Sequence, residues 1–165
     1  MRDVRIEISL RLQQLALFES APESERLLVK YPVSTALNGA GEADGSYCTP
    51  RGKHRISQKI GTSAPLFAVF KSRVATGEIW TPQLEENAPG CDWILSRILW
   101  LEGIEAGKNQ GGTVDSHARY IYIHGTNEEH KIGTPVSHGC IRMKNADVVT
   151  LYDLVEVGTP VSIND

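Results

Sequence analysis

The sequence lacks a long apolar run. It contains no stretch of about 20 consecutive apolar residues, the length that a membrane-spanning helix needs. The start of a secretory signal is also missing. Residues 1–3 lead directly into the alternating segment 5–10 and not into an apolar run of roughly 7–15 residues. We therefore expect no membrane span and a cytoplasmic location.

Cysteine is scarce, and a dense run of basic residues is absent. Cys48, Cys91 and Cys140 form an odd, widely spaced set, whereas a disulfide scaffold favours an even number in a shorter chain. We expect three reduced thiols, as in a reducing compartment. The formal net charge of −3, with no cluster of Lys and Arg, indicates that nucleic acid is not the partner.

The composition is that of one globular domain. Hydrophobic residues make up 41% of the chain and charged residues 22%, which are ordinary values for a globular protein. At 165 residues the chain is long enough to bury a hydrophobic core without disulfides or metals. We expect a single domain over residues 1–165.

Strand patterns dominate the chain. Alternating or β-branched segments predict strands over residues 5–10, 14–18, 27–33, 53–60, 66–70, 94–101, 120–123 and 161–163. Proline and glycine indicate loops over 81–92 and 102–118. One helix is predicted, capped by Asn145, with apolar residues at helical spacing from Val148 to Val155 and an end at Gly158. The fold class is therefore mostly β with at least one packed helix.

Residues 120–143 (YIYIHGTNEEHKIGTPVSHGCIRM) are the segment most suggestive of chemistry. Small, polar, turn-forming residues surround a cysteine and two histidines, which is not how a hydrophobic core is built. Cys140 is a candidate nucleophile, and a neighbouring imidazole can take its proton. Gly139 allows close backbone approach, as an oxyanion site made of main-chain N–H groups requires. Arg142 is suited to binding a carboxylate through two parallel hydrogen bonds.

Spacing alone does not identify the base. His138 lies two residues before Cys140 and shares a face with it on an extended chain, whereas His124 lies at the rigid end of a predicted strand. A zinc site is an alternative for this cluster. It is disfavoured because one residue separates His138 from Cys140, where two to four are usual, and no fourth ligand presents itself.

This segment resembles the signature of the L,D-transpeptidase catalytic domain (YkuD-type) family. That signature is a strand ending in His-Gly-Thr, a short loop, and then Ser-His-Gly-Cys, an apolar residue and Arg or Asn. Twelve residues separate His124 from Ser137 here. Residues 49–56 (TPRGKHRI) resemble another family segment, and the strand-rich residues 5–34 resemble the opening meander. Residues 78–118 carry no motif of the family.

The resemblance implies a role for each matching residue. Cys140 would be the nucleophile and His124 its general base, with the carbonyl of Gly125 orienting the His124 ring. The same resemblance implies site-shaping and substrate-binding residues: Ser137, His138 and Gly139 around an oxyanion site, Arg142 for a stem carboxylate, and His54 as a candidate contact. The implied fold is a β-sandwich-like domain with short helices. No cofactor and no metal are implied.

The implied substrate is the peptide stem of peptidoglycan. Cys140 would attack the bond between an L-centred diamino acid and terminal D-Ala, leaving a thioester. Water as acceptor gives an L,D-carboxypeptidase, and an amine from another stem gives a crosslink. We favour the carboxypeptidase, acting on muropeptide tetrapeptides in cell-wall recycling, because a leaderless chain does not reach the polymeric wall. A non-catalytic muropeptide-binding module is the alternative of another class.

Overall fold

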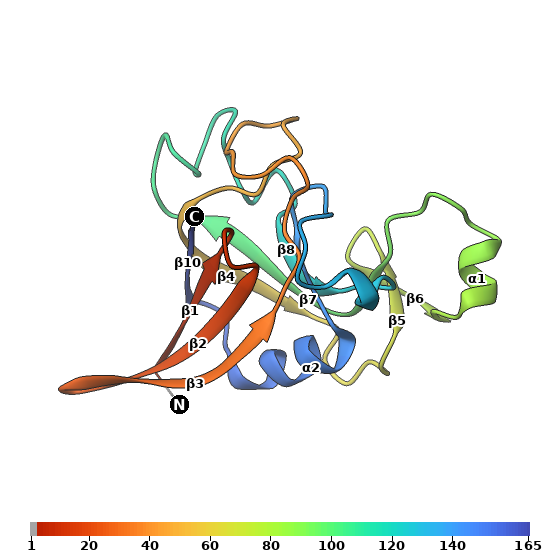
Figure 1. The fold of residues 1–165 in the computed structure, drawn as a ribbon, viewed down its shortest axis with the longest axis horizontal. Coiled ribbons are helices and arrows are strands. Elements are labelled where there is room, and N and C mark those ends of the chain that lie inside the picture. Colours follow the sequence, from red (N-terminus) through yellow and green to blue (C-terminus); the bar gives the residue numbers. More distant parts are fainter. Residues whose placement is uncertain (1–2) are drawn as a thin grey trace.

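The computed structural model describes residues 3–165 and contains ten strands, two α-helices and a short 3₁₀-helix within them (Figure 1). The strands are β1 (Val4–Ser9), β2 (Gln14–Ala21), β3 (Ser24–Pro32), β4 (Gly52–Ile60), β5 (Ala68–Lys71), β6 (Val74–Ile79), β7 (Ile94–Gly103), β8 (Tyr122–Gly125), β9 (Ile141–Met143) and β10 (Pro160–Asn164). The helices are α1 (Pro82–Glu86), η1 (Glu129–Lys131) and α2 (Asn145–Leu154). The prediction of a mostly β fold with short helices is confirmed.

The strands form a mixed sheet in the order β3-β2-β1-β10-β4-β7-β5-β6, and β8 and β9 continue from the other edge of β7. The β1–β10 and β8–β9 pairs are parallel, and the other pairs are antiparallel. The segment that follows β3 forms two isolated bridges. Ser34 pairs with Arg142 of β9, and Ala36 pairs with Ser137, which precedes β9. The hydrogen-bonded path therefore closes on itself and encloses a core.

Alternation along the strands fills this core. Ile6 and Ile8 of β1, Leu99 of β7 and Ile123 of β8 are at most 1% exposed and belong to one cluster. Burying each such side chain contributes roughly 1.5–3 kcal/mol. Since successive strand residues point to opposite faces, their polar neighbours lie on the outer face of the sheet.

Helix α2 packs on β7 and β8 through Val148, Leu151 and Tyr152, as the helical spacing predicts. The predicted cap is wrong, because Lys144 is the N-cap residue and Asn145 is the first helical residue. The Asn145 side chain points inward instead. Its Nδ2 donates to the Thr126 carbonyl at 2.8 Å, and its Oδ1 accepts from the Ser96 hydroxyl at 2.6 Å. The helix also ends earlier than predicted, with Val155 as its C-cap residue rather than at Gly158.

Three further expectations differ from the structure. Helix α1 lies in the segment predicted as loop, because the Thr81 hydroxyl accepts from the Leu84 N–H and proline occupies the first turn. Strand β6 was not predicted, because every residue of it is exposed and carries no apolar alternation. The predicted strand 120–123 begins only at Tyr122, because Tyr120 has a φ of +57°, outside the range of a strand.

Three long connections contact one another: residues 33–51 and 104–121, which form the loops at the top of Figure 1, and residues 126–140. Backbone hydrogen bonds join them, from Asp44 to Thr113 at 2.7 Å and from Val136 to Thr35 at 2.9 Å. The Arg119 guanidinium donates to the carbonyl of Cys48 at 2.7 Å. The connections are therefore fixed to one another at the place where Cys140 lies. No helix in the described part of the chain is both long and apolar enough to cross a bilayer.

We expect Asn145→Ala to lower the free energy of unfolding by about 1–3 kcal/mol, because the substitution leaves buried hydrogen-bonding partners unsatisfied. Urea denaturation followed by circular dichroism measures the change. Asn38→Ala is the matched control. Its exposed amide makes one 3.2 Å hydrogen bond, and we expect a loss below about 0.5 kcal/mol. Equal losses in the two variants would contradict the structural role assigned to Asn145.

Candidate active site

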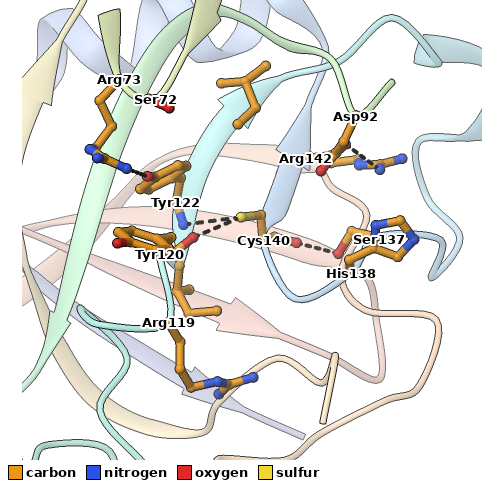
Figure 2. A pocket seen from close by; sticks show the side chains of 12 residues that line it. Ser72, Arg73, Asp92, Arg119, Tyr120, Tyr122, Ser137, His138, Cys140 and Arg142 are labelled. Carbon is orange, nitrogen blue, oxygen red and sulfur yellow. Dashed lines mark hydrogen bonds and ion pairs between the residues drawn. The ribbon is translucent and has the colours of Figure 1, made fainter. Parts of the chain in front are cut away.

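Cys140 lies immediately before β9 and lines a cavity of about 410 Å³. Figure 2 shows its side chain between Tyr120 and Tyr122 on one side and Ser137, His138 and Arg142 on the other. The residue is half-buried. A ligand that enters the cavity therefore reaches the sulfur.

The thiol is held by the backbone of the neighbouring strand. Its Sγ lies 3.3 Å from the Tyr120 carbonyl, to which the S–H donates, and 3.4 Å from the Tyr122 N–H, which donates to the sulfur. Tyr120, which has a positive φ, supplies this carbonyl. Burial raises the pKa of the Cys140 thiol to about 12, and the Tyr122 N–H opposes that rise. The resting group is therefore a neutral thiol.

His124 is fully buried on β8, and its ring is oriented by one hydrogen bond. Nδ1 lies 2.7 Å from the Gly125 carbonyl. Because a carbonyl only accepts, Nδ1 carries the hydrogen and Nε2 keeps its lone pair. Within residues 3–165, Nε2 has no hydrogen-bond partner. Burial lowers the pKa of His124 below its ordinary value of 6.5, so this imidazole is a neutral base.

The register of β8 against β9 places His124 and Cys140 on one face of the sheet. Ile123 pairs with Ile141 in the core, and His124 pairs with Arg142 on the other face. Residues two apart on a strand share a face, so Cys140 and Arg142 lie on the same side as His124. The thiol is turned toward Tyr120 in this structure. Proton transfer requires it to approach Nε2, an approach that substrate binding commonly completes.

Ser137 and Gly139 build the turn that precedes the thiol. The Ser137 hydroxyl donates to the Cys140 carbonyl at 2.6 Å and accepts from the Gly139 N–H at 3.1 Å. Since the Gly139 amide is used in this way, the amides of His138 and Cys140 remain as the candidate oxyanion donors. Gly139 has a φ of +130°, and its carbonyl accepts from the Thr49 hydroxyl at 2.8 Å.

His138 and Arg142 both line the cavity. The His138 ring is exposed and lies edge-on to Tyr47, with ring centroids 6.0 Å apart. The Arg142 guanidinium donates to Asp92 at 3.0 Å and to Glu128 at 3.2 Å, and its side chain is only 7% exposed. The Arg142 guanidinium, which was expected to bind a substrate carboxylate, is thus bonded to the carboxylates of Asp92 and Glu128. That role stays a prediction, and it requires Asp92 to be displaced.

His54 lies away from the cavity. It is 1% exposed on β4, with Nδ1 3.0 Å from the Gly52 carbonyl and Nε2 2.8 Å from the Ser116 hydroxyl. Nε2 therefore ties the 104–121 connection to β4 through the Ser116 side chain, while Nδ1 is bonded within β4 itself. The candidate substrate contact is not supported by this position, because a buried ring with two internal partners has no free atom for a ligand.

Sequence reasoning missed eight of the residues that line the cavity: Ser72, Arg73, Asp92, Ile94, Arg119, Tyr120, Ile121 and Tyr122. A signal existed for Tyr122, which is two residues before His124 and so shares its strand face. No motif marks Arg73 or Asp92, since they come from a hairpin and a loop distant in sequence. Among residues 3–165, no three His, Cys, Asp or Glu side chains are grouped so as to hold a metal ion.

The chain belongs to the L,D-transpeptidase catalytic domain family (YkuD), whose family model matches residues 3–163. Curated relatives include a probable L,D-transpeptidase of Escherichia coli, YbiS, which is 35% identical over 98 residues covering 52% of this chain and 32% of that protein. A putative L,D-transpeptidase of Bacillus subtilis, YqjB, is 56% identical over 80 residues, which cover 48% of this chain and 37% of that protein. The matched region thus spans about a third of these relatives.

Solved structures share the fold. An L,D-transpeptidase from Mycobacterium smegmatis has a TM-score of 0.56 and 19% identity, covering 99% of this chain and 59% of that one. The L,D-transpeptidase LdtMt1 in complex with imipenem has a TM-score of 0.56 and 17% identity, covering 98% and 59%. At this identity the likeness supports the fold alone. The family assignment rests on the sequence match.

We expect Gly139→Ala to lower the free energy of unfolding by about 3 kcal/mol, because a Cβ is strained at this φ and would lie 3.1 Å from the Cys48 carbonyl. Gly133→Ala is the control on the same connection. Its φ is +104°, but a Cβ there meets no atom within 4 Å, so a loss of about 1 kcal/mol is expected. Chemical denaturation measures both. A smaller loss for Gly139→Ala than for Gly133→Ala would show that the close contact is unimportant.

The raised pKa of Cys140 predicts slow alkylation at neutral pH. In a Cys48→Ser/Cys91→Ser background, the rate with iodoacetamide is expected to rise about tenfold per pH unit between pH 6 and 9 without a plateau, because the thiolate fraction is rising throughout. A small free thiol with a pKa near 8.5 serves as the reference and levels off above its pKa. A plateau below pH 8 would instead indicate a preformed thiolate–imidazolium pair.

Proposed function

We propose that this chain is a cysteine acyl-transferase that acts on peptidoglycan peptide stems at the L,D bond before terminal D-Ala. The observation that carries the proposal is the pairing of groups on the outer face of β8 and β9. There a cavity-lining thiol lies on the same face as a neutral imidazole whose Nε2 has no hydrogen-bond partner within residues 3–165. Membership in the L,D-transpeptidase family supports the substrate class.

In the proposed first step, the Cys140 proton passes to His124 Nε2 as the sulfur attacks the carbonyl carbon of the L,D bond. Main-chain N–H groups at the turn before Cys140 hold the developing oxyanion. Collapse breaks the C–N bond, and the amine of D-Ala leaves with the proton from His124. The stem then remains as a thioester on Cys140.

Burial explains why the attack and the proton transfer are coupled. The surroundings raise the pKa of Cys140 and lower that of His124, so both charged forms are disfavoured before substrate binds. The Tyr120 carbonyl accepts the S–H and would repel a thiolate, whereas the Tyr122 N–H would stabilise it. The thiolate therefore forms only as its charge is passed to the substrate.

We further propose water as the acceptor, which makes the enzyme an L,D-carboxypeptidase on muropeptide tetrapeptides. The partial exposure of Cys140 supports this, because solvent reaches the position of the thioester. Water gives its proton to His124, its oxygen attacks the thioester carbon, and the C–S bond breaks to release the tripeptide. The proton then returns to the sulfur. The cytoplasmic location expected from the sequence stays a prediction that cell fractionation tests.

Incubation with a disaccharide-tetrapeptide, read by mass spectrometry, tests the proposal. We expect loss of one alanine and no crosslinked dimer, and we expect Cys140→Ala to reduce the rate at least about 10³-fold, because a covalent route is removed. Cys91→Ala is the matched control, since Cys91 is an exposed thiol that does not line the cavity. Its rate should be unchanged.

The other outcomes are informative. Crosslinked dimers, or exchange of the terminal residue for an added D-amino acid, would contradict hydrolysis and establish a transpeptidase. No turnover, together with no imipenem adduct on Cys140, would contradict the enzyme and leave a binding module. The imipenem complex of the related LdtMt1 makes imipenem a suitable probe of the thiol.

A further inference from the structure

Three arginines line the cavity that contains Cys140. Two of them, Arg119 and Arg142, each make several hydrogen bonds within the protein. Arg142 donates to two carboxylates, Asp92 and Glu128. Arg119 donates to the carbonyls of residues 41, 42 and 48 and to the hydroxyl of Ser46. Each of these two guanidiniums therefore holds loops together.

Arg73 is bonded differently. Its one hydrogen bond among the described residues runs from Nη1 to the Tyr122 hydroxyl at 2.9 Å, and it forms no ion pair with any carboxylate of residues 3–165. Within residues 3–165, Nη2 and Nε have no hydrogen-bond acceptor. An arginine with an unused pair of donors at the wall of a cavity is suited to a carboxylate ligand.

Aromatic rings fix the position of this guanidinium. Its Cζ lies 4.8 Å from the Tyr120 ring centroid and 5.0 Å from that of Trp100, which is itself stacked on His117 at 3.9 Å. Such cation–π contacts orient the charge without using its N–H donors. The guanidinium is thereby held in place while its remaining N–H groups stay available.

The turn that presents Arg73 is strained. Ser72 and Arg73 join β5 to β6, and their φ values are +46° and +66°. A two-residue turn with both φ values positive favours Asn-Gly or Gly-Gly, because a Cβ is disfavoured there. Strain that persists at the wall of a binding cavity is typical of a residue retained for function.

Tyr122 connects this site to the thiol. Its N–H donates to Cys140 Sγ and its hydroxyl accepts from Arg73, so one tyrosine side chain separates the two groups (Figure 2). The Arg73 guanidinium therefore lies one tyrosine side chain away from a stem carbonyl placed at the sulfur. Arg73 also borders a second, mostly apolar cavity of about 590 Å³, so the residue lies between two cavities.

We propose that Arg73 binds a carboxylate of the peptide stem and positions the stem for attack by Cys140. This inference rests on the function proposed above. It assigns to Arg73 the carboxylate recognition that the sequence suggested for Arg142. The carboxylate is either that of terminal D-Ala or another one along the stem, and the two cases are separated below.

Steady-state kinetics on the disaccharide-tetrapeptide test the proposal. Arg73→Gln is expected to raise KM by about ten- to hundredfold with a smaller change in kcat, because a charged hydrogen bond to the bound stem is lost. Arg73→Lys should restore part of the affinity. Lys71→Gln removes an exposed charge from the same hairpin outside the cavity, and its KM should not change. Equal KM values for Arg73→Gln and the parent would overturn the proposal.

Two modified substrates identify the carboxylate. One carries an amide at the terminal D-Ala, and the other has every carboxylate except the terminal one amidated. The substrate that lacks the bound carboxylate should show the same KM with the parent and with Arg73→Gln. If Arg73→Gln raises KM equally on both modified substrates, Arg73 does not act through a carboxylate and the proposal is wrong.

Arg73→Gly tests whether the KM effect comes from the strained turn, because glycine adopts the positive φ of the turn without strain. This variant should keep the parent's thermal midpoint and still show the raised KM. A parental KM in folded Arg73→Gly would overturn the proposal.

A separate measurement distinguishes failure of the proposed reaction from failure of the proposed Arg73 site. If the parent turns over no stem, calorimetry compares tetrapeptide binding to Cys140→Ala with binding to Cys140→Ala/Arg73→Gln. Weaker binding by the double variant would keep the Arg73 site and reject the reaction. Absence of binding to Cys140→Ala would overturn both.

Discussion

The parallel pairing of β8 with β9 is the constraint on which the rest of the site depends. Parallel strands cannot be joined by a tight turn and need a connection of about a dozen residues or more. Residues 126–140 form that connection here. The chain therefore leaves β8 just after His124 and returns at Cys140, immediately before the neighbouring strand β9, which accounts for the separation of the two halves of the motif.

The core holds this pairing in register. Ile123 and Ile141 are fully buried partners, so a slip of β8 by one residue would turn Ile123 out of the core and move His124 into it. Gly125 allows the close packing of β8 against β7 and α2. A Cβ there would lie 2.7 Å from the Leu95 carbonyl and collide with the Asn145 amide, and its own carbonyl orients His124. Packing on the inner face thus determines the geometry of the chemistry on the outer face.

The electrostatics of the cavity follow from burial together with three arginines. Burial keeps thiol and imidazole neutral at rest. The arginines supply positive charge, but two of them are committed to fixing the loops. A substrate carboxylate therefore meets three arginines, of which Arg73 makes a single hydrogen bond among the described residues and is held by aromatic faces rather than by ion pairs.

The sequence by itself determined the mostly β class, the approximate position of most strands and the residues of the motif from His124 to Arg142. Those features depend on local alternation and on short spacings that a linear pattern records. It did not reveal α1, whose cap signal in Thr81 and Pro82 was overlooked, or β6, which has no buried face. The sequence also predicted Asn145 as the helix N-cap. An asparagine at a helix start gives the same sequence pattern whether its side-chain amide caps the helix or points into the interior.

Only the tertiary structure decided which charged groups are free. Arg142 has the chemistry to bind a carboxylate, yet its partners Asp92 and Glu128 lie 50 and 14 residues away along the chain. Arg73 reaches the cavity because β5 and β6 continue the sheet beyond β7, and His54 is withdrawn because the 104–121 connection packs over it. Residue type sets what a side chain is able to do. Contacts between segments distant in sequence decide whether its donors remain available to a substrate.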